Sequence, residues 1–197
     1  MPELSIALMA AGSSSRMGSP KALLDWGGQS LLSFQIQKLH DLDLPVNLIL
    51  GSESEQVQSH ISGFQGKIFV NDNWSEGMSS SMAFATQCLE DSEATLFYLV
   101  DQPLIELSDL KRLINFHRQN PQKIIVSRSS EAWSGPPVIF PKKFFQELMQ
   151  LSGDLGGKPL VKKHPDDVIF VELDSSMEDM DTPEAYQKLL AKANLRS

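Results

Sequence analysis

The sequence predicts a single α/β domain over residues 1–197, built on a mostly parallel, doubly wound sheet of the Rossmann-like type. Short apolar runs alternate with helix-like segments along most of the chain, as expected of parallel strands joined by crossover helices. The length suffices for one hydrophobic core. The chain also lacks repeats, low-complexity stretches and linkers, so nothing in it suggests a second domain.

Four apolar runs in the first half predict strands at residues 4–9, 46–50, 67–70 and 95–100. Each run is short and soon meets a Gly, Asn or Asp, which is typical of buried strands in a parallel sheet. Helices are expected between them, from residue 30 to about 39, over residues 53–61 and over residues 79–89. Ser30 is the expected N-cap of the first of these helices.

The second half continues the alternation. A helix opening at Ser108 precedes a strand at residues 123–127. A short strand is expected at residues 138–140, because prolines flank it on both sides and proline donates no ladder hydrogen bond. A helix over residues 142–151, a strand over 167–173 and a final helix over 182–193 complete the chain. Pro183 fits the first turn of that last helix.

Composition excludes several classes of protein. Hydrophobic residues make up 41% of the chain, yet no apolar run approaches the roughly 20 residues that span a bilayer. The start of the chain lacks the basic segment of a secretory signal, and Cys88 is the only cysteine. We therefore expect a cytoplasmic protein with no disulfide and no membrane partner. The net charge of −8 argues against a nucleic-acid partner and requires local cations for any anionic substrate.

The loop after the first predicted strand has the character of a phosphate site. It contains two glycines and several serines, whose small side chains leave backbone N–H groups accessible to an anion. Arg16 and Lys21 add two positive charges. The spacing matches neither the P-loop nor the dinucleotide fingerprint. The same residues also fit an ordinary Ser/Gly-rich turn with incidental charges.

Two acidic positions are candidate metal ligands. Asp101 ends the strand at residues 95–100, where a carboxylate can hold Mg²⁺ beside substrate phosphates. It also fits a simple turn before Pro103. Asp181 lies in the acidic stretch 178–184, which capping of the last helix by Asp181 or Thr182 would explain equally well. Because parallel strands end at one edge, the loops at Gly12, Asn71, Asp101 and Arg128 should meet there.

The pattern A-A-G-x-S-x-R-M-G-x-x-K at residues 10–21 resembles the signature of the MobA-like NTP-transferase family. Within that family it is most similar to the molybdenum cofactor cytidylyltransferases, because guanylyltransferases typically carry Ala-Gly-Gly in place of residues 10–12. Met9 replaces the usual Leu. The resemblance extends from Leu4 to about Tyr186 and includes D-Q-P at 101–103 and D-x-D-T-P-E at 179–184.

The resemblance implies the nucleotidyltransferase form of the fold and a set of site residues. Arg16, Lys21 and Asp101 would be catalytic, and Asp101 with Asp181 would hold Mg²⁺ as a complex with the NTP. The implied nucleotide-binding residues are Ala10, Ala11, Gly12, Ser13, Ser14, Arg16, Lys21, Asn73, Gly77 and Ser81. On the acceptor side they are Gly135, Pro137, Gly153, Asp154 and Gly156. Pro136 stands where many relatives carry His.

The implied reaction is attack by the terminal phosphate of a molybdopterin-type cofactor on the α-phosphorus of CTP, with release of pyrophosphate. A phosphomonoester has a second pKa of about 6 and needs no general base at pH 7, and no Ser-His-Asp or Cys-His set is apparent. Alternatives are a guanylyltransferase or a sugar- or polyol-phosphate nucleotidyltransferase of the same fold. Another is a chaperone that delivers the cofactor to a molybdoenzyme client.

Overall fold

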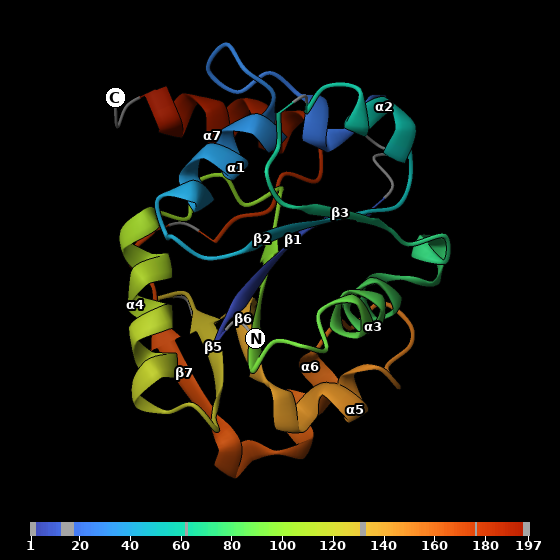
Figure 1. Cartoon of the computed structure of the whole chain (residues 1–197). Helices are drawn as coiled ribbons and strands as arrows, with labels where there is room; N and C mark the ends of the chain where they lie inside the picture. The colour runs from blue at the N-terminus through green and yellow to red at the C-terminus, as the bar shows by residue number, and fades with distance from the viewer. Residues whose placement is uncertain (1–2, 13–17, 62, 131–132, 176, 195–197) are drawn as a thin grey trace.

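The computed structural model describes residues 3–12, 18–61, 63–130, 133–175 and 177–194. The described residues form a seven-stranded sheet with the order β3-β2-β1-β4-β6-β5-β7 (Figure 1). Its strands are β1 (Ser5–Ala10), β2 (Val46–Leu50), β3 (Lys67–Val70), β4 (Ala94–Leu99), β5 (Ile124–Arg128), β6 (Ser134–Pro141) and β7 (Val168–Glu172). The four neighbouring pairs that do not involve β6 are parallel.

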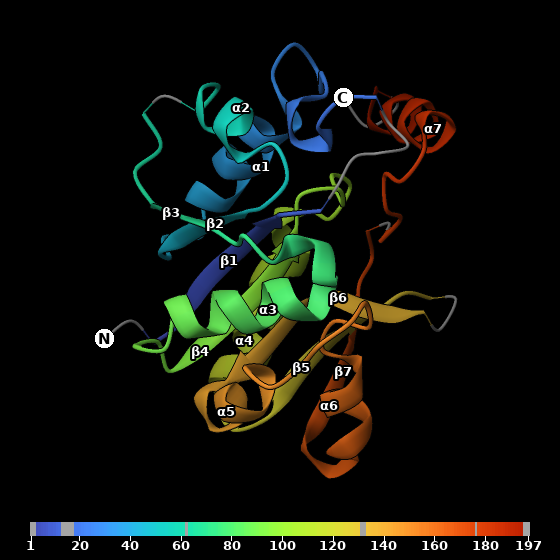
Figure 2. The same ribbon diagram turned by 90° about the vertical axis from the view of Figure 1, so that its right-hand side faces the viewer.

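Helices cover both faces of the sheet, which confirms the doubly wound α/β fold. On one face, α1 (Leu31–His40), α4 (Leu107–Gln119) and α7 (Pro183–Asn194) contribute to a core that includes Leu8, Leu48 and Tyr98. On the other, α3 (Met78–Cys88), α5 (Phe145–Leu148) and α6 (Lys158–Lys163) surround a core that includes Phe97 and Phe140. Figure 2 shows α3 lying in front of the sheet, with α5 and α6 below it in this view.

Several boundaries agree with the sequence prediction because the local signals are strong. β2 and β3 occupy the predicted residues, and the Ser30 side chain accepts a hydrogen bond from the Ser33 backbone N–H at 3.1 Å. Two helices are shorter than expected. The helix α2 covers only Ser54–Gln58. It cannot begin at Glu53, which has a left-handed backbone (φ 58°), and Val57 is the only residue that it buries. The segment expected as one helix over 142–151 begins as a 3-10 turn, and α5 ends at Leu148.

The prediction for residues 138–140 was too short, because the prolines do not end the strand. Strand β6 is antiparallel to both β4 and β5 and lies between them. Val126 pairs with Val138, but the next residue, Ser127, pairs with Gly135. Pro136 and Pro137 therefore occupy a bulge, where a missing ladder N–H leaves no partner unsatisfied. The Ser127 hydroxyl donates to the Pro137 carbonyl oxygen at 2.5 Å, which ties the bulge to β5.

The parallel strands place several loops at the same edge of the sheet. The carboxyl ends of β1, β2 and β4 lie side by side, with Met9 opposite both Ile49 and Leu99. The sequence predicted this arrangement for the loops at Gly12, Asn71 and Asp101. None of the described helices is long and apolar enough to cross a membrane.

Candidate active site

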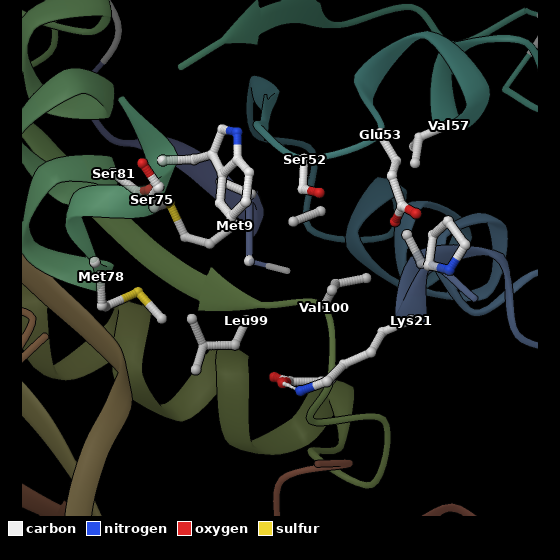
Figure 3. Close-up of a pocket in the computed structure, with 18 of the residues that line it drawn as sticks. Met9, Lys21, Ser52, Glu53, Val57, Ser75, Met78, Ser81, Leu99 and Val100 are labelled. Atoms are coloured by element: carbon white, nitrogen blue, oxygen red, sulfur yellow. Dashed lines mark hydrogen bonds and ion pairs between the residues drawn. The ribbon is translucent and has the colours of Figure 1, made fainter. Parts of the chain in front are cut away.

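A cavity of about 330 Å³ opens at the carboxyl ends of β1 to β4. Its lining comes from the segments that follow these four strands and from the start of α3, as Figure 3 shows. Lys21 lies on one side of the cavity, with Ser52 and Glu53 on another and Ser75 and Ser81 across from it. The cavity therefore brings together residues as far apart in the sequence as Met9 and Asp154, as in other open α/β sheets.

Lys21, Asp101 and Asp181 meet beside this cavity. The Lys21 Nζ atom donates to Asp101 Oδ2 at 2.7 Å and to Asp181 Oδ1 at 2.5 Å. The Lys21 and Asp101 side chains are each 17% exposed, whereas that of Asp181 is 51% exposed. Lys21 begins a 3-10 turn that directs its side chain inward, and Asp101 follows the last residues of β4. The three residues thus form one charged cluster at the edge of the sheet.

Burial and charge act in opposite directions on Lys21. Desolvation disfavours its ammonium, but Asp101 and Asp181 outweigh desolvation and raise the Lys21 pKa above its ordinary value. Asp179 lies near the same cluster. Burial, supported by the charge of Asp101, raises the pKa of Asp179 to about 6, although a hydrogen bond from Gln102 opposes the shift. The cluster therefore contains a firmly charged cation, and the neighbouring Asp179 is a weaker acid than an ordinary aspartate.

The donor chemistry of the cluster fits a divalent metal. Asp101 and Asp181 offer hard carboxylate oxygens close enough to share one ammonium group. In the described part of the chain, no three His, Cys, Asp or Glu side chains are arranged as a complete metal site. The pair of carboxylates from Asp101 and Asp181 suits Mg²⁺ or Mn²⁺. These ions bind through one or two carboxylates and complete their coordination with water and phosphate oxygens.

The predicted nucleotide-binding residues divide into three groups by their position. Those that line the cavity are Ala10, Ala11, Gly12, Lys21, Gly77 and Ser81. Asn73 does not line it, and instead its backbone carbonyl accepts from the Ser80 hydroxyl at 3.0 Å. Ser13, Ser14 and Arg16 lie outside the described residues.

Gly77 has a steric reason for lacking a side chain. Its φ of +102° favours glycine, and a Cβ there would lie 2.1 Å from Asp154 Oδ1 and 2.6 Å from the Gly153 carbonyl oxygen. Gly77 also lines the first cavity. The space on its Cβ side is filled by the loop that contains Asp154, so Gly77 joins the start of α3 to that loop.

A second cavity of about 240 Å³ lies beyond Asp154. It shares Met78, Leu99 and Asp154 with the first cavity, so the two spaces are neighbours. Lys158 lies 5.9 Å from the ring centroid of Trp133, and both residues line the second cavity.

The predicted acceptor-side residues lie around this second cavity. Gly135, Asp154 and Gly156 line it. Pro137 and Gly153 do not, and their carbonyl oxygens accept from the Ser127 hydroxyl and the Ser79 backbone N–H. Arg128, expected to join the loops at the strand ends, lines neither cavity and stacks on Phe170 at 3.9 Å.

Some residues of the site escaped the sequence analysis. Ser52 and Glu53 line the first cavity because they follow β2, and the strand-end rule that selected Asp101 would have found them too. Trp74 also lines it, packed so closely on Gly51 that a Cβ on Gly51 would lie 2.5 Å from the Trp74 Cβ. Gln102 lies within the D-Q-P motif, but the motif does not reveal that its buried side chain contacts Asp179, because that contact depends on which distant segment packs against it.

Comparison with known proteins agrees with this geometry. The model of the MobA-like NTP transferase domain matches residues 6–168. A curated relative, nicotine blue oxidoreductase of Paenarthrobacter nicotinovorans, is 29% identical over 96% of this chain and 98% of its own. A probable molybdenum cofactor guanylyltransferase of Rhodopirellula baltica is 27% identical over 70% of this chain and 67% of its own. Sequences of the bifunctional protein GlmU also match, but over only 27% to 29% of their own length.

Solved structures show the same fold. The crystal structure of Rv0371c from Mycobacterium tuberculosis H37Rv is 25% identical, covers 96% of this chain and 98% of its own, and superposes with a TM-score of 0.86. A structure of Rv0371c in complex with manganese has the same coverage, 24% identity and a TM-score of 0.81. The single-domain α/β fold is therefore shared with these proteins.

Proposed function

Because this chain belongs to the MobA-like NTP transferase family, we propose that its reaction is the transfer of CMP from CTP to the terminal phosphate of a molybdopterin-type cofactor. Pyrophosphate is the second product. The observation that carries this proposal is the cluster of Lys21, Asp101 and Asp181 beside the first cavity, at the carboxyl ends of the strands. It combines a cation for a polyphosphate with two carboxylates for a metal, which are the parts that nucleotidyl transfer requires.

The chemistry needs charge control more than proton transfer. The acceptor phosphate is already largely dianionic at pH 7 and attacks an α-phosphorus surrounded by negative charge. Lys21 would bind the triphosphate and neutralise the departing pyrophosphate, as positioned cations do in other phosphoryl transfers. Asp101 and Asp181 would hold a divalent metal, which supplies further neutralisation at the α-phosphate. On substrate binding, the Lys21 ammonium would then exchange the two carboxylates for the triphosphate. Asp101 and Asp181 would exchange the Lys21 ammonium for the metal.

The two cavities support a division between donor and acceptor. Residues 10–12, Lys21 and Gly77 line the first, which we assign to the nucleotide. The second has largely apolar walls, and its lining includes Trp133 and Lys158, a combination that suits a flat heterocycle carrying a phosphate. Met78, Leu99 and Asp154 border both cavities, so the reacting phosphates would meet between them.

The choice of CTP follows from Ala10, Ala11 and Gly12, which resemble the cytidylyltransferase pattern more than Ala-Gly-Gly. The test is incubation of the purified protein with molybdopterin cofactor, Mg²⁺ or Mn²⁺, and CTP, GTP, ATP or UTP in turn. We expect pyrophosphate and a product heavier by CMP with CTP, and no turnover after chelation of the metal. Preference for GTP would assign a guanylyltransferase, and a sugar or polyol phosphate as better acceptor would assign that class. Cofactor binding and transfer to a molybdoenzyme without pyrophosphate would indicate a delivery chaperone.

A second candidate is a redox reaction, favoured by the similarity to nicotine blue oxidoreductase over nearly the whole chain. In that case the first cavity would hold the nucleotide of an electron donor, and the second a flat aromatic acceptor. The test is bleaching of nicotine blue with a reduced nicotinamide dinucleotide. Bleaching without any pyrophosphate release from NTPs would replace the nucleotidyl transfer proposal.

A further inference from the structure

Asp101 and Asp181 are 80 residues apart, and no strand pairing among the described residues joins their segments. Asp101 follows β4 in the middle of the sheet, whereas Asp181 precedes α7. Figure 2 shows the chain between β7 and α7 running from the lower part of the molecule up to α7, outside the sheet. A specific contact must therefore set where the Asp181 carboxylate lies relative to Asp101.

Gln102 makes that contact. Its side chain is fully buried, and its Nε2 atom donates to Asp179 Oδ1 at 2.9 Å and to the Met177 carbonyl oxygen at 3.4 Å. Next to it, the Met180 backbone N–H donates to the Asp101 carbonyl oxygen at 3.0 Å. The segment 177–181 is thus joined to residues 101–102 by hydrogen bonds on both sides of the acidic residue Asp179.

The backbone that carries Gln102 is itself held from the opposite side. The Tyr98 hydroxyl lies 3.0 Å from the Gln102 carbonyl oxygen and 3.0 Å from Gln35 Oε1. The Gln35 side-chain N–H donates to the Val100 carbonyl oxygen at 2.9 Å. The Lys38 Nζ atom donates to the carbonyl oxygens of Pro103 and Ile105, at 2.9 and 2.8 Å. Buried side chains of α1 and β4 therefore fix the turn after β4, so Gln102 is a rigid anchor.

Burial of apolar side chains alone cannot orient segment 177–181 as the hydrogen bonds of Gln102 do. The Met177 and Met180 side chains are 5% and 0% exposed and attach the segment to the core. Hydrophobic contact is not directional, and methionine in particular adapts to its surroundings. Hydrogen bonds depend on distance and angle. The donations of Gln102 are therefore what orients residues 178–181 between the two buried methionines.

We propose that Gln102 is a positioning residue that holds segment 177–181 so that the Asp181 carboxylate meets Asp101 and Lys21. The catalytic importance of that meeting rests on the proposed function, but the structural coupling does not. Gln102 touches neither nucleotide nor metal in this scheme, and it acts through Asp179 and the Met180 backbone. Loss of its side-chain donations leaves the chain folded but separates the two carboxylates.

The test uses Gln102→Met, which keeps the length of the side chain and removes both donations. The Gln102 Oε1 atom is buried without a hydrogen-bond partner among the described residues. Methionine therefore also removes an unsatisfied acceptor, which offsets part of the stability lost when Asp179 and Met177 lose their donor. Asp179→Ala is the second variant, since it removes the acceptor at a half-buried residue. Asn47→Leu is the matched control, because Asn47 is a buried amide that bonds to the Ile6 carbonyl oxygen near the amino ends of the strands.

We expect amide hydrogen exchange at Met180 to be about fivefold faster in Gln102→Met and Asp179→Ala. Mn²⁺ affinity should fall by about ten- to a hundredfold, as for other residues that orient metal ligands. The decrease in kcat should be larger than the change in the KM for the nucleotide. Asn47→Leu should leave all three unchanged even where it lowers Tm. Unchanged Met180 exchange in both variants would overturn the inference. If the wild type neither binds Mn²⁺ nor releases pyrophosphate, the proposed function fails, while the exchange result still decides the role of Gln102.

Discussion

Lys21 holds two carboxylates with a single ammonium group in the described structure. The Asp101 and Asp181 oxygens that it contacts are those that we assign to a metal. In the proposed substrate complex the two carboxylates would hold the metal and Lys21 would bind the triphosphate, so each charge would remain compensated. This exchange avoids leaving two neighbouring carboxylates without a cation, which would cost free energy through like-charge repulsion.

Lys21→Ala should lower the rate of pyrophosphate release by about a hundredfold or more, the usual loss when one charge-stabilising donor is removed. The fold should remain, because Lys21 is at the edge of the sheet and its neighbour Ala22 carries the core contact. The measurement is pyrophosphate release together with Tm. Lys111→Ala is the control, since Lys111 is an exposed lysine of α4, and equal rates in the two variants would remove Lys21 from the mechanism.

Asp101→Asn should nearly abolish turnover, because an amide keeps the shape of the carboxylate but loses the charge that attracts the metal. Titration with Mn²⁺ should show weaker binding in the same variant. Asp91→Asn changes an exposed aspartate away from the cavity and should behave as wild type. Normal Mn²⁺ affinity in Asp101→Asn would show that the metal is held elsewhere.

At the scale of elements, the junction between α3 and the loop 153–157 shapes both cavities. The Ser79 backbone N–H donates to the Gly153 carbonyl oxygen at 2.8 Å, and the Ser79 hydroxyl donates to the Gly156 carbonyl oxygen at 3.2 Å. Asp154 is held at the border between the two cavities by these contacts and by the close approach of Gly77. The start of α3 therefore sets the position of the loop on the proposed acceptor side.

Gly77→Ala should lower the free energy of unfolding by about 1–3 kcal/mol, because its backbone angles lie in a region almost restricted to glycine. The added Cβ would also displace Asp154, so KM for both substrates should rise. The measurements are urea unfolding and steady-state kinetics. Gly63→Ala shares the positive φ but meets no atom within 4 Å, so it should lose stability with unchanged KM. A rise in KM for Gly63→Ala would show that strain alone explains the effect.

The antiparallel strand β6 is the element that departs most from the expected alternation. It inserts between β4 and β5, so the chain returns across the sheet without a helix. Its amino end then lies beside the carboxyl ends of β4 and β5, which brings Ser134 and Gly135 to the second cavity. The prolines in its bulge allow this strand to begin four residues before the predicted start.

At the scale of the whole molecule, local charge acts against the net charge. The chain carries −8, so its overall field repels an anionic nucleotide. The compensating cation at the described cavity is supplied by Lys21, which the neighbouring carboxylates keep charged. Association with substrate is therefore expected to depend on the local cluster and on bound metal more than on long-range attraction.

Stability of the whole molecule should depend on pH through Lys38. Burial lowers its pKa to about 7, against the charge of Glu106, from the ordinary value of 10.5. Between those pH values the unfolded chain binds one more proton than the folded chain. The free energy of unfolding should therefore rise with pH, by up to about 1.4 kcal/mol per pH unit. Below pH 7 Lys38 is charged in both states and adds no slope.

Urea unfolding of the wild type and Lys38→Met at pH 7, 8 and 9 measures this effect. The difference in unfolding free energy between the two proteins should grow in favour of the wild type as pH rises. Lys111→Met serves as the control for removal of an exposed lysine. Parallel profiles for the wild type and Lys38→Met would contradict the assignment of this slope to Lys38.

The sequence by itself determined the α/β class, most strand positions, the Ser30 cap and the motifs around Lys21, Asp101 and Asp181. These features depend on hydrophobic periodicity and on the chemistry of a few neighbouring residues, so a short stretch of sequence is enough to specify each of them. Only the tertiary structure decided the central place of β6, the contact of Gly77 with Asp154, and the anchoring of segment 177–181 by Gln102. Each of these depends on which distant segments pack together, and no local pattern specifies a partner tens of residues away.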